Sequence, residues 1–323
     1  MKLTRSFVAM LLLCASALPL PSTAETYPSR AIQFIVPYTP GTTADVLARL
    51  LGAKLSQRWN VPVVVDNKTG ASGIIGAAAA AKAAPDGYTF LFAATSFSTL
   101  AAVNSNLPYD PVKSFAPVSL LGTSSMTLVV NSKFPANSVQ EFVEQIRKQP
   151  GLVNYSSPGT GSSQHLAMEL FQQEAGINIV HIPYKGSAGA VNDLIGGQVQ
   201  ASVVSLQTAT PFVKNGNIRL LAVMGRERAA SFPQVPTLLE LGYSNMLVST
   251  WYGVLAPAGT PPALIAKMSA ELNNLLALPD MKEAMAKQGV DPAGGKPEVL
   301  GALLKHELEL WTKVVARGKI VVD

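Results

Sequence analysis

Hydroxyl side chains gather at two places in the sequence, each directly before a predicted helix. The first stretch is "PYTPGTTADVLAR" at residues 37–49, and the second is "YSSPGTGSSQHLAMELF" at residues 155–171. Both contain Pro-Gly-Thr. The first follows the apolar run "IQFIV" and the second follows "VNY", and each is predicted to be a turn between a strand and a helix. Because Ser, Thr and Gly also cap helices that bind no ligand, capping alone stays an alternative for each turn.

The chemistry that such turns could perform is the binding of an anion. A helix start carries N–H groups without an intrahelical acceptor and the positive end of the helix dipole, so it can hold a carboxylate without any arginine. We predict that the two turns form facing walls of one cleft that binds a small carboxylate. The candidate ligand-binding residues are Tyr38, Gly41, Thr42, Thr43, Asp45, Ser96, Ser157, Gly159, Thr160, Gly161, Ser162, Ser163, His165 and Ser205.

Neither turn contains an arginine ahead of its helix. Asp45 is predicted in the first helical turn, where its charge suits the helix dipole or braces the loop. We expect Arg49 to point along its helix, away from the N-terminus, and Arg219, Arg226 and Arg228 to lie at the surface. The carboxylate is therefore predicted to be held by the two helix starts and not by an arginine.

A hydrolase using Ser163 and His165 is the alternative function. The sequence contains no G-x-S-x-G motif, and the two residues are only two positions apart, whereas triad partners usually come from separate elements. His165 could instead face the cleft or form a local hydrogen bond. His181 is expected to be structural and His306 to be solvated. We predict that the protein is not an enzyme.

Metal and cofactor sites have little support in the sequence. Cys14 is the single cysteine, and the three histidines include no closely spaced pair, which disfavours zinc. The run "GTGSSQ" at 159–164 is a broken G-x-G-x-x-G, and no G-x-x-x-x-G-K-[ST] occurs. We predict neither a metal nor a cofactor.

Residues 1–24 have the pattern of a signal peptide: basic Lys2 and Arg5, an apolar stretch, and small residues at Ser22 and Ala24. Cleavage near Ala24 would leave 299 of the 323 residues and lower the formal net charge from +5 to +3. Since the remaining basic residues are scattered, nucleic-acid binding is not predicted. We expect an exported, soluble monomer.

Strand and helix patterns alternate along the chain, which predicts an α/β fold with mainly parallel sheets flanked by helices. We predict two lobes joined by crossings near 116–127 and 248–256, which would form a hinge; one large open sheet is the alternative. Lobe 1 is predicted to comprise 25–125 and 253–323, and lobe 2 to comprise 126–252. The predicted strands are 31–36, 61–66, 88–94, 126–130, 153–157, 177–183, 199–205, 218–224 and 249–259, and the predicted helices are 43–58, 74–84, 138–151, 162–176, 187–197, 261–277, 280–288 and 297–316.

Several segments together resemble the solute-binding proteins of tripartite tricarboxylate transporters, the Bug family. Besides the two turns, with "YPSRAIQFIV" before the first of them, they are "APDGYT" at 84–89, "FAPVSLL" at 115–121, "VHIPYKGSAGAVNDLIGGQVQ" at 180–200, "QVPTLLELGY" at 234–243 and "WYGVLAPAGTP" at 251–261. They follow one another in order over nearly the whole chain after residue 24.

The resemblance implies a periplasmic binding protein of two lobes that closes over a small organic carboxylate and delivers it to the membrane subunits of a transporter. It also implies that the loops at 38–45 and 156–165 hold one carboxylate, partly through backbone N–H groups and ordered water. Many relatives have a second Gly where this chain has Thr42, and an Asp-Asn pair where it has Val204 and Ser205. The missing negative group argues against an amino-acid ligand, but dicarboxylates, tricarboxylates, aromatic acids and amino acids all stay open.

Overall fold

Residues 27–320 are described by a computed structural model. The predicted signal peptide and its cleavage site near Ala24 lie outside these residues. None of the described helices is long and apolar enough to cross a membrane.

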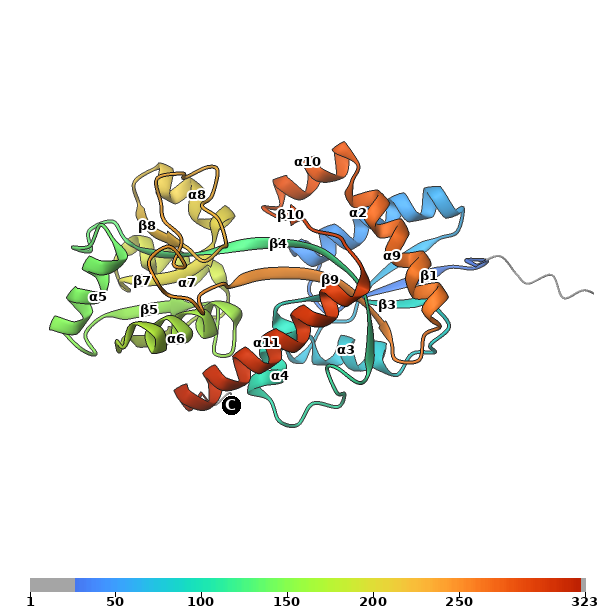
Figure 1. Ribbon diagram of the computed structural model, residues 1–323, viewed down its shortest axis with the longest axis horizontal. Coiled ribbons are helices and arrows are strands. Elements are labelled where there is room, and N and C mark those ends of the chain that lie inside the picture. Colours follow the sequence, from blue (N-terminus) through green and yellow to red (C-terminus); the bar gives the residue numbers. More distant parts are fainter. Residues whose placement is uncertain (1–26, 321–323) are drawn as a thin grey trace, which may run out of the picture.

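The described chain forms two α/β lobes, which confirms the predicted fold class (Figure 1). Lobe 1 contains a sheet in the order β2-β1-β3-β9-β4, with the short β10 beside β4. Its helices cover both faces: α2, α9 and α10 pack on one face, and α3, α4 and part of α11 pack on the other. The elements before the first crossing are β1 (Ile32–Val36), α2 (Thr43–Trp59), β2 (Val63–Asn67), η2 (Ala71–Gly73), α3 (Ile74–Ala81), β3 (Thr89–Ala94) and α4 (Ser96–Val103).

Lobe 2 contains a sheet in the order β6-β5-β7-β4, with β8 also paired to β4. Helices α5 and α6 pack on one face, and α7 and α8 pack on the other. Ser138 caps α5 as predicted, because its side chain accepts a hydrogen bond from the Glu141 N–H. The elements are α5 (Val139–Lys148), β5 (Asn154–Ser157), α6 (Ser163–Ala175), β6 (Val180–Pro183), α7 (Ser187–Gly196), β7 (Ala201–Ser205), α8 (Leu206–Lys214) and β8 (Ile218–Val223).

Two long strands run between the lobes, β4 (Phe115–Asn131) and β9 (Ser249–Pro257), close to the predicted crossings. They pair with each other, and β4 continues into lobe 2, where it pairs with β7 and β8. Hydrogen bonding is therefore continuous through β4 although the molecule has two lobes. Each sheet is mixed. Strands β1, β2 and β3 are parallel in lobe 1 and β5, β6 and β7 in lobe 2, while both crossing strands run antiparallel to their neighbours.

The end of the chain returns to lobe 1 and then extends onto lobe 2. Helix α11 packs Leu300 and Leu304 into a core cluster of lobe 1, and Trp311 and Val314 into the main core cluster of lobe 2. Our assignment of 253–323 to lobe 1 did not anticipate this span; the lobe boundaries themselves stay a prediction. The closing elements are α9 (Pro262–Leu276), α10 (Pro279–Lys287), β10 (Asp291–Pro292) and α11 (Pro297–Gly318).

A buried carboxylate lies where α11 leaves lobe 1. The Glu307 Oε2 atom accepts hydrogen bonds from Ser98 Oγ at 2.8 Å, Trp311 Nε1 at 2.8 Å and Trp251 Nε1 at 3.3 Å. Burial raises the pKa of the Glu307 carboxyl, while these three donors oppose that shift. The carboxylate thereby ties together α4, β9 and α11, the elements that meet between the lobes.

Some local predictions were wrong or incomplete. The run "VPVVVD" at 61–66 is mainly apolar, which predicts a buried strand, but β2 lies at the sheet edge and Val64 is 52% exposed. Helices α4 and α8 were not predicted: α4 has only eight residues, and α8 contains Pro211, which sequence rules read as a helix breaker.

Candidate ligand-binding site

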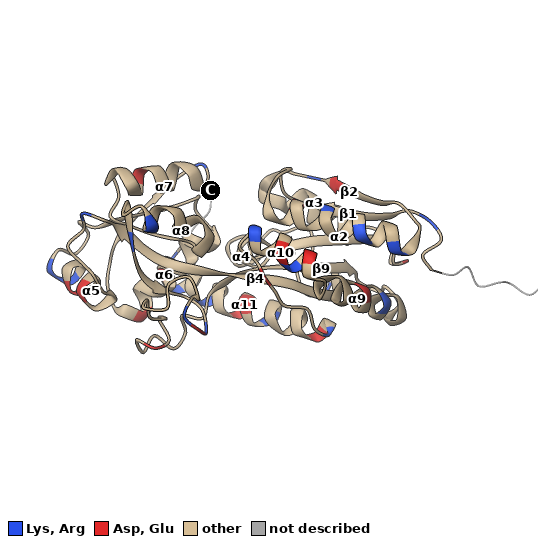
Figure 2. Cartoon of the chain, turned by 90° about the horizontal axis from the view of Figure 1, so that it is seen from above, with Lys and Arg blue, Asp and Glu red and all other residues tan. Residues whose placement is uncertain are grey.

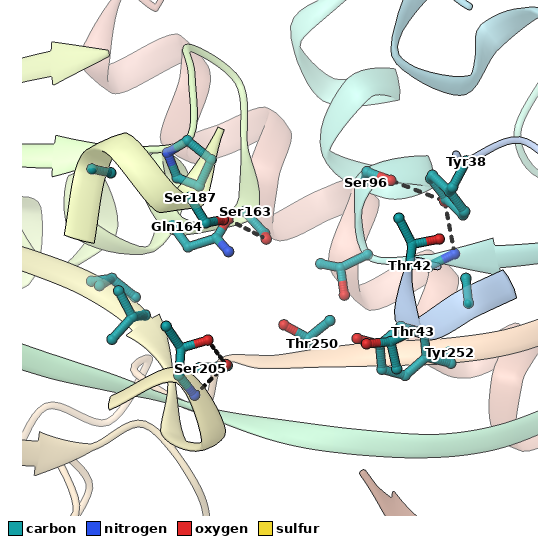
Figure 3. A pocket seen from close by; sticks show the side chains of 18 of the residues that line it. Tyr38, Thr42, Thr43, Ser96, Ser163, Gln164, Ser187, Ser205, Thr250 and Tyr252 are labelled. Carbon is teal, nitrogen blue, oxygen red and sulfur yellow. Dashed lines mark hydrogen bonds between the residues drawn. The ribbon is translucent and has the colours of Figure 1, made fainter. Parts of the chain in front are cut away.

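A pocket of about 450 Å³ lies between the two lobes. In Figure 3, side chains of lobe 1 face side chains of lobe 2 across it, with Thr250 of β9 between them. The lining residues are Tyr38, Gly41, Thr42, Thr43, Ala44, Ala94, Thr95, Ser96, Pro158, Ser163, Gln164, Ser187, Ala190, Val191, Ser202, Val203, Val204, Ser205, Thr208, Thr250 and Tyr252.

Five helices of the described chain begin at this pocket: α2 and α4 in lobe 1, and α6, α7 and α8 in lobe 2. The first helical residues Thr43, Ser96, Ser163 and Ser187 line it, as does Ser205, which caps α8. The first N–H groups of a helix have no intrahelical acceptor. The pocket therefore concentrates hydrogen-bond donors and the positive ends of several helix dipoles.

Charged side chains are absent from the part of the pocket wall that residues 27–320 form. Arg219 donates to the backbone oxygens of Ser132, Phe134 and Ala136, and Arg226 and Arg228 are exposed, so none of these arginines reaches the pocket. Figure 2 shows Lys and Arg interspersed with Asp and Glu over both lobes. The positive character of the pocket thus comes from backbone dipoles and not from cationic side chains.

The Tyr38 hydroxyl is fixed at the lobe 1 wall. Its oxygen accepts hydrogen bonds from the Ala94 N–H at 3.0 Å and from Ser96 Oγ at 2.9 Å. Burial, the larger effect, raises the pKa of Tyr38 to about 12, so the hydroxyl stays protonated at neutral pH. Because the oxygen already accepts two bonds, its hydrogen is free to be donated into the pocket.

The first turn is braced from behind by Asp45, which is 2% exposed and does not line the pocket. Its carboxylate accepts hydrogen bonds from the Gly41 N–H at 2.9 Å and Asn67 Nδ2 at 2.8 Å, and pairs with Arg49 at 3.0 Å. Burial alone would raise the pKa of the Asp45 carboxyl, but these bonds outweigh burial and lower it. Arg49 was expected to point away from the helix start; it reaches back instead, because the buried carboxylate attracts it.

The second turn is braced by histidine. His165 is 4% exposed, and its Nδ1 atom lies 3.1 Å from the Gly161 nitrogen, which donates to it. His181 stacks on His165 and lies 2.7 Å from Ser157 Oγ through Nε2. Of the two roles predicted for His165, the local hydrogen bond is confirmed.

The predicted site residues divide into two groups. Seven line the pocket: Tyr38, Gly41, Thr42, Thr43, Ser96, Ser163 and Ser205. The other seven do not line the pocket but lie in the second turn or in the first turn of the helix that follows either turn: Asp45, Ser157, Gly159, Thr160, Gly161, Ser162 and His165. Ligand contact by any of them stays a prediction.

Several lining residues were not among the predicted ones. Ser187 follows Gly186 at the start of a helix that we did predict, so the same hydroxyl-at-helix-start signal could have found it. Thr208 belongs to α8, which was missed, and Thr250 lies on the crossing strand β9. Tyr252 of β9 also lines the pocket, whereas its neighbour Trp251 is fully buried.

The geometry gives no support to the hydrolase alternative. Ser163 Oγ donates to Gln164 Oε1, while the Nδ1 atom of His165 is taken by Gly161. Within residues 27–320, the serine hydroxyl that bonds an imidazole nitrogen is that of Ser157, with His181, but Ser157 is fully buried outside the pocket. Within the described residues, no group of three or more His, Cys, Asp or Glu side chains could hold a metal.

The comparison with known proteins agrees with these features. The family model described as "Tripartite tricarboxylate transporter family receptor" matches residues 47–319. The chain belongs to this receptor family. It is 38% identical to protein BugT of Bordetella pertussis over 318 residues, which covers 98% of either chain.

Solved structures of other proteins are similar to this chain over nearly their whole length. R. palustris Rpa4515 with adipate is 32% identical, with a TM-score of 0.77, 91% of this chain covered and 99% of that one. MatC from Rhodopseudomonas palustris with bound malate is 28% identical, with a TM-score of 0.74, 90% of this chain covered and 100% of that one. Both proteins carry dicarboxylates in their structures.

We predict that Tyr38→Phe weakens ligand binding without unfolding lobe 1. The variant removes the hydroxyl hydrogen that would bond the carboxylate, and a hydrogen bond to a charged group contributes about 1–3 kcal/mol to affinity. It also leaves the Ala94 N–H without its acceptor, which lowers folding stability and not affinity. Affinity should fall by about 5- to 150-fold in calorimetry. Tyr252→Phe is the matched control, since Tyr252 lines the same pocket from β9 and its hydroxyl bonds the Thr43 side chain, whereas the Tyr38 hydroxyl bonds a backbone N–H. Equal affinities of Tyr38→Phe and the unmodified protein would contradict the role of this hydroxyl.

Proposed function

We propose that this receptor-family protein captures a small organic carboxylate in the pocket between its lobes. The observation that carries the proposal is the convergence of five helix starts on a pocket whose described wall has no charged side chain. A carboxylate placed there would accept hydrogen bonds from backbone N–H groups and hydroxyls, and its charge would be stabilised by the helix dipoles.

The same wall disfavours an ammonium group. A buried ammonium group is stabilised by a carboxylate, yet the described wall supplies no Asp or Glu, and the positive ends of the helix dipoles would oppose a cation there. On the lobe 2 side, Ala190, Val191 and Val204 add an apolar patch that suits the carbon chain of a ligand. We therefore propose an aliphatic mono- or dicarboxylate in preference to an amino acid.

We further propose that the protein works in the periplasm, as a monomer, and delivers its ligand to the membrane subunits of a tripartite tricarboxylate transporter. The family description and the signal-peptide pattern of residues 1–24 support this placement. Closure of the lobes around β4 and β9 would distinguish loaded from empty receptor, provided that the ligand binds the closed form more tightly.

A thermal-shift panel tests the ligand class. Malate, adipate, citrate, benzoate and glutamate should be compared, and we expect aliphatic carboxylates to raise the melting temperature more than glutamate. A ligand at a hundred times its Kd adds about 2.7 kcal/mol to folded stability, which amounts to several degrees. Mass spectrometry of the same mixtures should recover each carboxylate unchanged.

The proposal has two clear ways to fail. A preference for glutamate over every dicarboxylate would contradict the argument from the uncharged wall. Chemical turnover that disappears in Ser163→Ala would contradict binding without catalysis.

A further inference from the structure

In each of the two turns that face the pocket, a glycine N–H donates a hydrogen bond to a side chain of the following helix. The acceptor is a carboxylate in the first turn and an imidazole in the second. Gly41 has φ +85°, and its N–H donates to Asp45, four residues later, at 2.9 Å. Gly161 has φ +78°, and its N–H donates to His165, also four residues later, at 3.1 Å. In each case the acceptor is the third residue of the helix that begins at the pocket.

Each of these two hydrogen bonds fixes the position of its turn relative to the helix that follows. A glycine in the left-handed region has a backbone that can adopt many other conformations, so one side-chain acceptor restricts it strongly. Directly after each glycine come the residues that start the helix and present its free N–H groups. The acceptor therefore orients the anion-binding end of the helix without touching the pocket.

We propose that neutral His165 is the positioning residue of the second turn, as Asp45 is of the first, and that it serves because it accepts a hydrogen bond without bringing negative charge. This rests on the proposed function, since the benefit concerns an anionic ligand. In lobe 1 the charge of Asp45 is balanced by Arg49 at 3.0 Å. In lobe 2 the His165 imidazole is itself uncharged. Neither the Asp45–Arg49 pair nor His165 therefore adds net negative charge beside a helix start.

The surroundings of His165 keep it neutral. Tyr155 of β5 and His181 of β6 stack with its ring, with centroids 6.3 and 3.9 Å away, and Glu169 of α6 lies 3.8 Å from Nε2. Glu169 already accepts a hydrogen bond from the Tyr155 hydroxyl at 2.6 Å. Burial first, and then the charge that His181 would carry, lower the pKa of His165 to about 3.

The stacked partner holds the other end of the same turn. His181 Nε2 lies 2.7 Å from Ser157 Oγ, which also donates to the Gly159 oxygen at 3.0 Å and accepts from the Gly159 nitrogen at 3.2 Å. Burial lowers the pKa of His181 to about 4. The two imidazoles thus fix both Gly159 and Gly161, on either side of Thr160.

Three substitutions of His165 test separately its hydrogen-bond acceptor, its aromatic ring and its lack of charge. H165N keeps a neutral acceptor near the Nδ1 position, H165F keeps an aromatic ring without an acceptor, and H165D keeps an acceptor but adds an unbalanced charge. Hydrogen exchange of the Gly161 amide in the ligand-free protein should stay slow in H165N and H165D and become fast in H165F. Affinity for malate and adipate should stay within about threefold in H165N and fall about tenfold or more in H165F and H165D.

Nitrogen NMR of the histidines gives a readout that does not depend on any ligand. At pH 7 we expect His165 to be neutral, with Nδ1 unprotonated, and to remain so down to about pH 5. Because the unfolded chain binds protons near pH 6.5 and folded His165 only near pH 3, its stabilising contribution is present above pH 6.5 and is lost as pH falls toward 3. H165N should reduce the slope of that part of the stability profile, and the slope that remains is expected from His181, whose pKa is lowered to about 4.

The outcomes separate this proposal from the proposed function. If the unmodified protein binds no carboxylate, the proposed function fails, and slow Gly161 exchange in H165N but not in H165F still supports the positioning role. A protonated Nδ1 at pH 7, or a protected Gly161 amide in H165F, overturns the positioning role whatever the ligand results. Native affinity in H165D overturns the argument from charge.

Discussion

Gly41→Val is expected to abolish carboxylate binding, with a loss of at least about a hundredfold in affinity. Gly41 lines the pocket with φ +85°, a conformation that a β-branched residue rarely adopts. An added Cβ meets no protein atom within 4 Å, so the new side chain would extend into free space at the pocket wall. The change in backbone conformation would also pull the Gly41 N–H away from Asp45. Calorimetry against malate and adipate measures the loss.

Gly151→Val provides the matched control for that experiment. Gly151 has φ +75°, and its added Cβ likewise meets no atom within 4 Å, but it lies after α5 and away from the pocket. Both variants should therefore lose about 1–3 kcal/mol of stability through backbone strain. Only Gly41→Val should lose affinity, and equal affinity in the two folded variants would place the ligand elsewhere.

The largest stability effect is expected from Trp311→Ala. Trp311 is fully buried on α11, packs in the main core of lobe 2, and donates its indole N–H to Glu307. Removing such a side chain costs about 3–5 kcal/mol through lost contacts and the cavity left behind. That is a large share of the roughly 5–15 kcal/mol by which proteins of this kind are stable. Denaturant unfolding followed by circular dichroism measures the difference.

Trp59→Ala is the control for this second prediction. Trp59 ends α2 and is only partly buried, with its ring 6.1 Å from that of Tyr27. Its truncation should cost about half as much or less, since less apolar surface is buried there. Similar losses in the two variants would show that α11 does not contribute to the core of lobe 2 as its packing indicates.

The sequence was sufficient for the parts of the site that depend on local pattern. A hydroxyl-rich turn between an apolar run and a periodic helix identified Thr43 and Ser163, because strand ends and helix starts leave local signals. The two crossings were predicted as well, because the order of strands and helices along the chain fits a chain that leaves lobe 1, builds lobe 2 and returns. The family resemblance agreed with both.

What could not be predicted depends on contacts between distant segments. That Asp45 and His165 brace their turns from behind requires knowing which way each helix faces, and a residue in the first turn can face either the pocket or the core. The direction of the Arg49 side chain was predicted wrongly, because the spacing of residues along a helix does not show that the Asp45 carboxylate is buried and attracts it. The span of α11 over both lobes depends on packing that no local periodicity encodes.

The path of α11 also bears on how the chain acquires its structure. Lobe 2 is made from the middle of the chain, yet its core is completed by Trp311 and Val314, and Gln173 donates to the Val314 oxygen across 141 positions of sequence. Contacts that distant are slow to form because a long loop must close before they contribute. During synthesis, lobe 2 would expose an apolar face until α11 has been made, so we expect its core to form completely only when α11 docks. An excised lobe 2 would keep that apolar surface exposed to solvent.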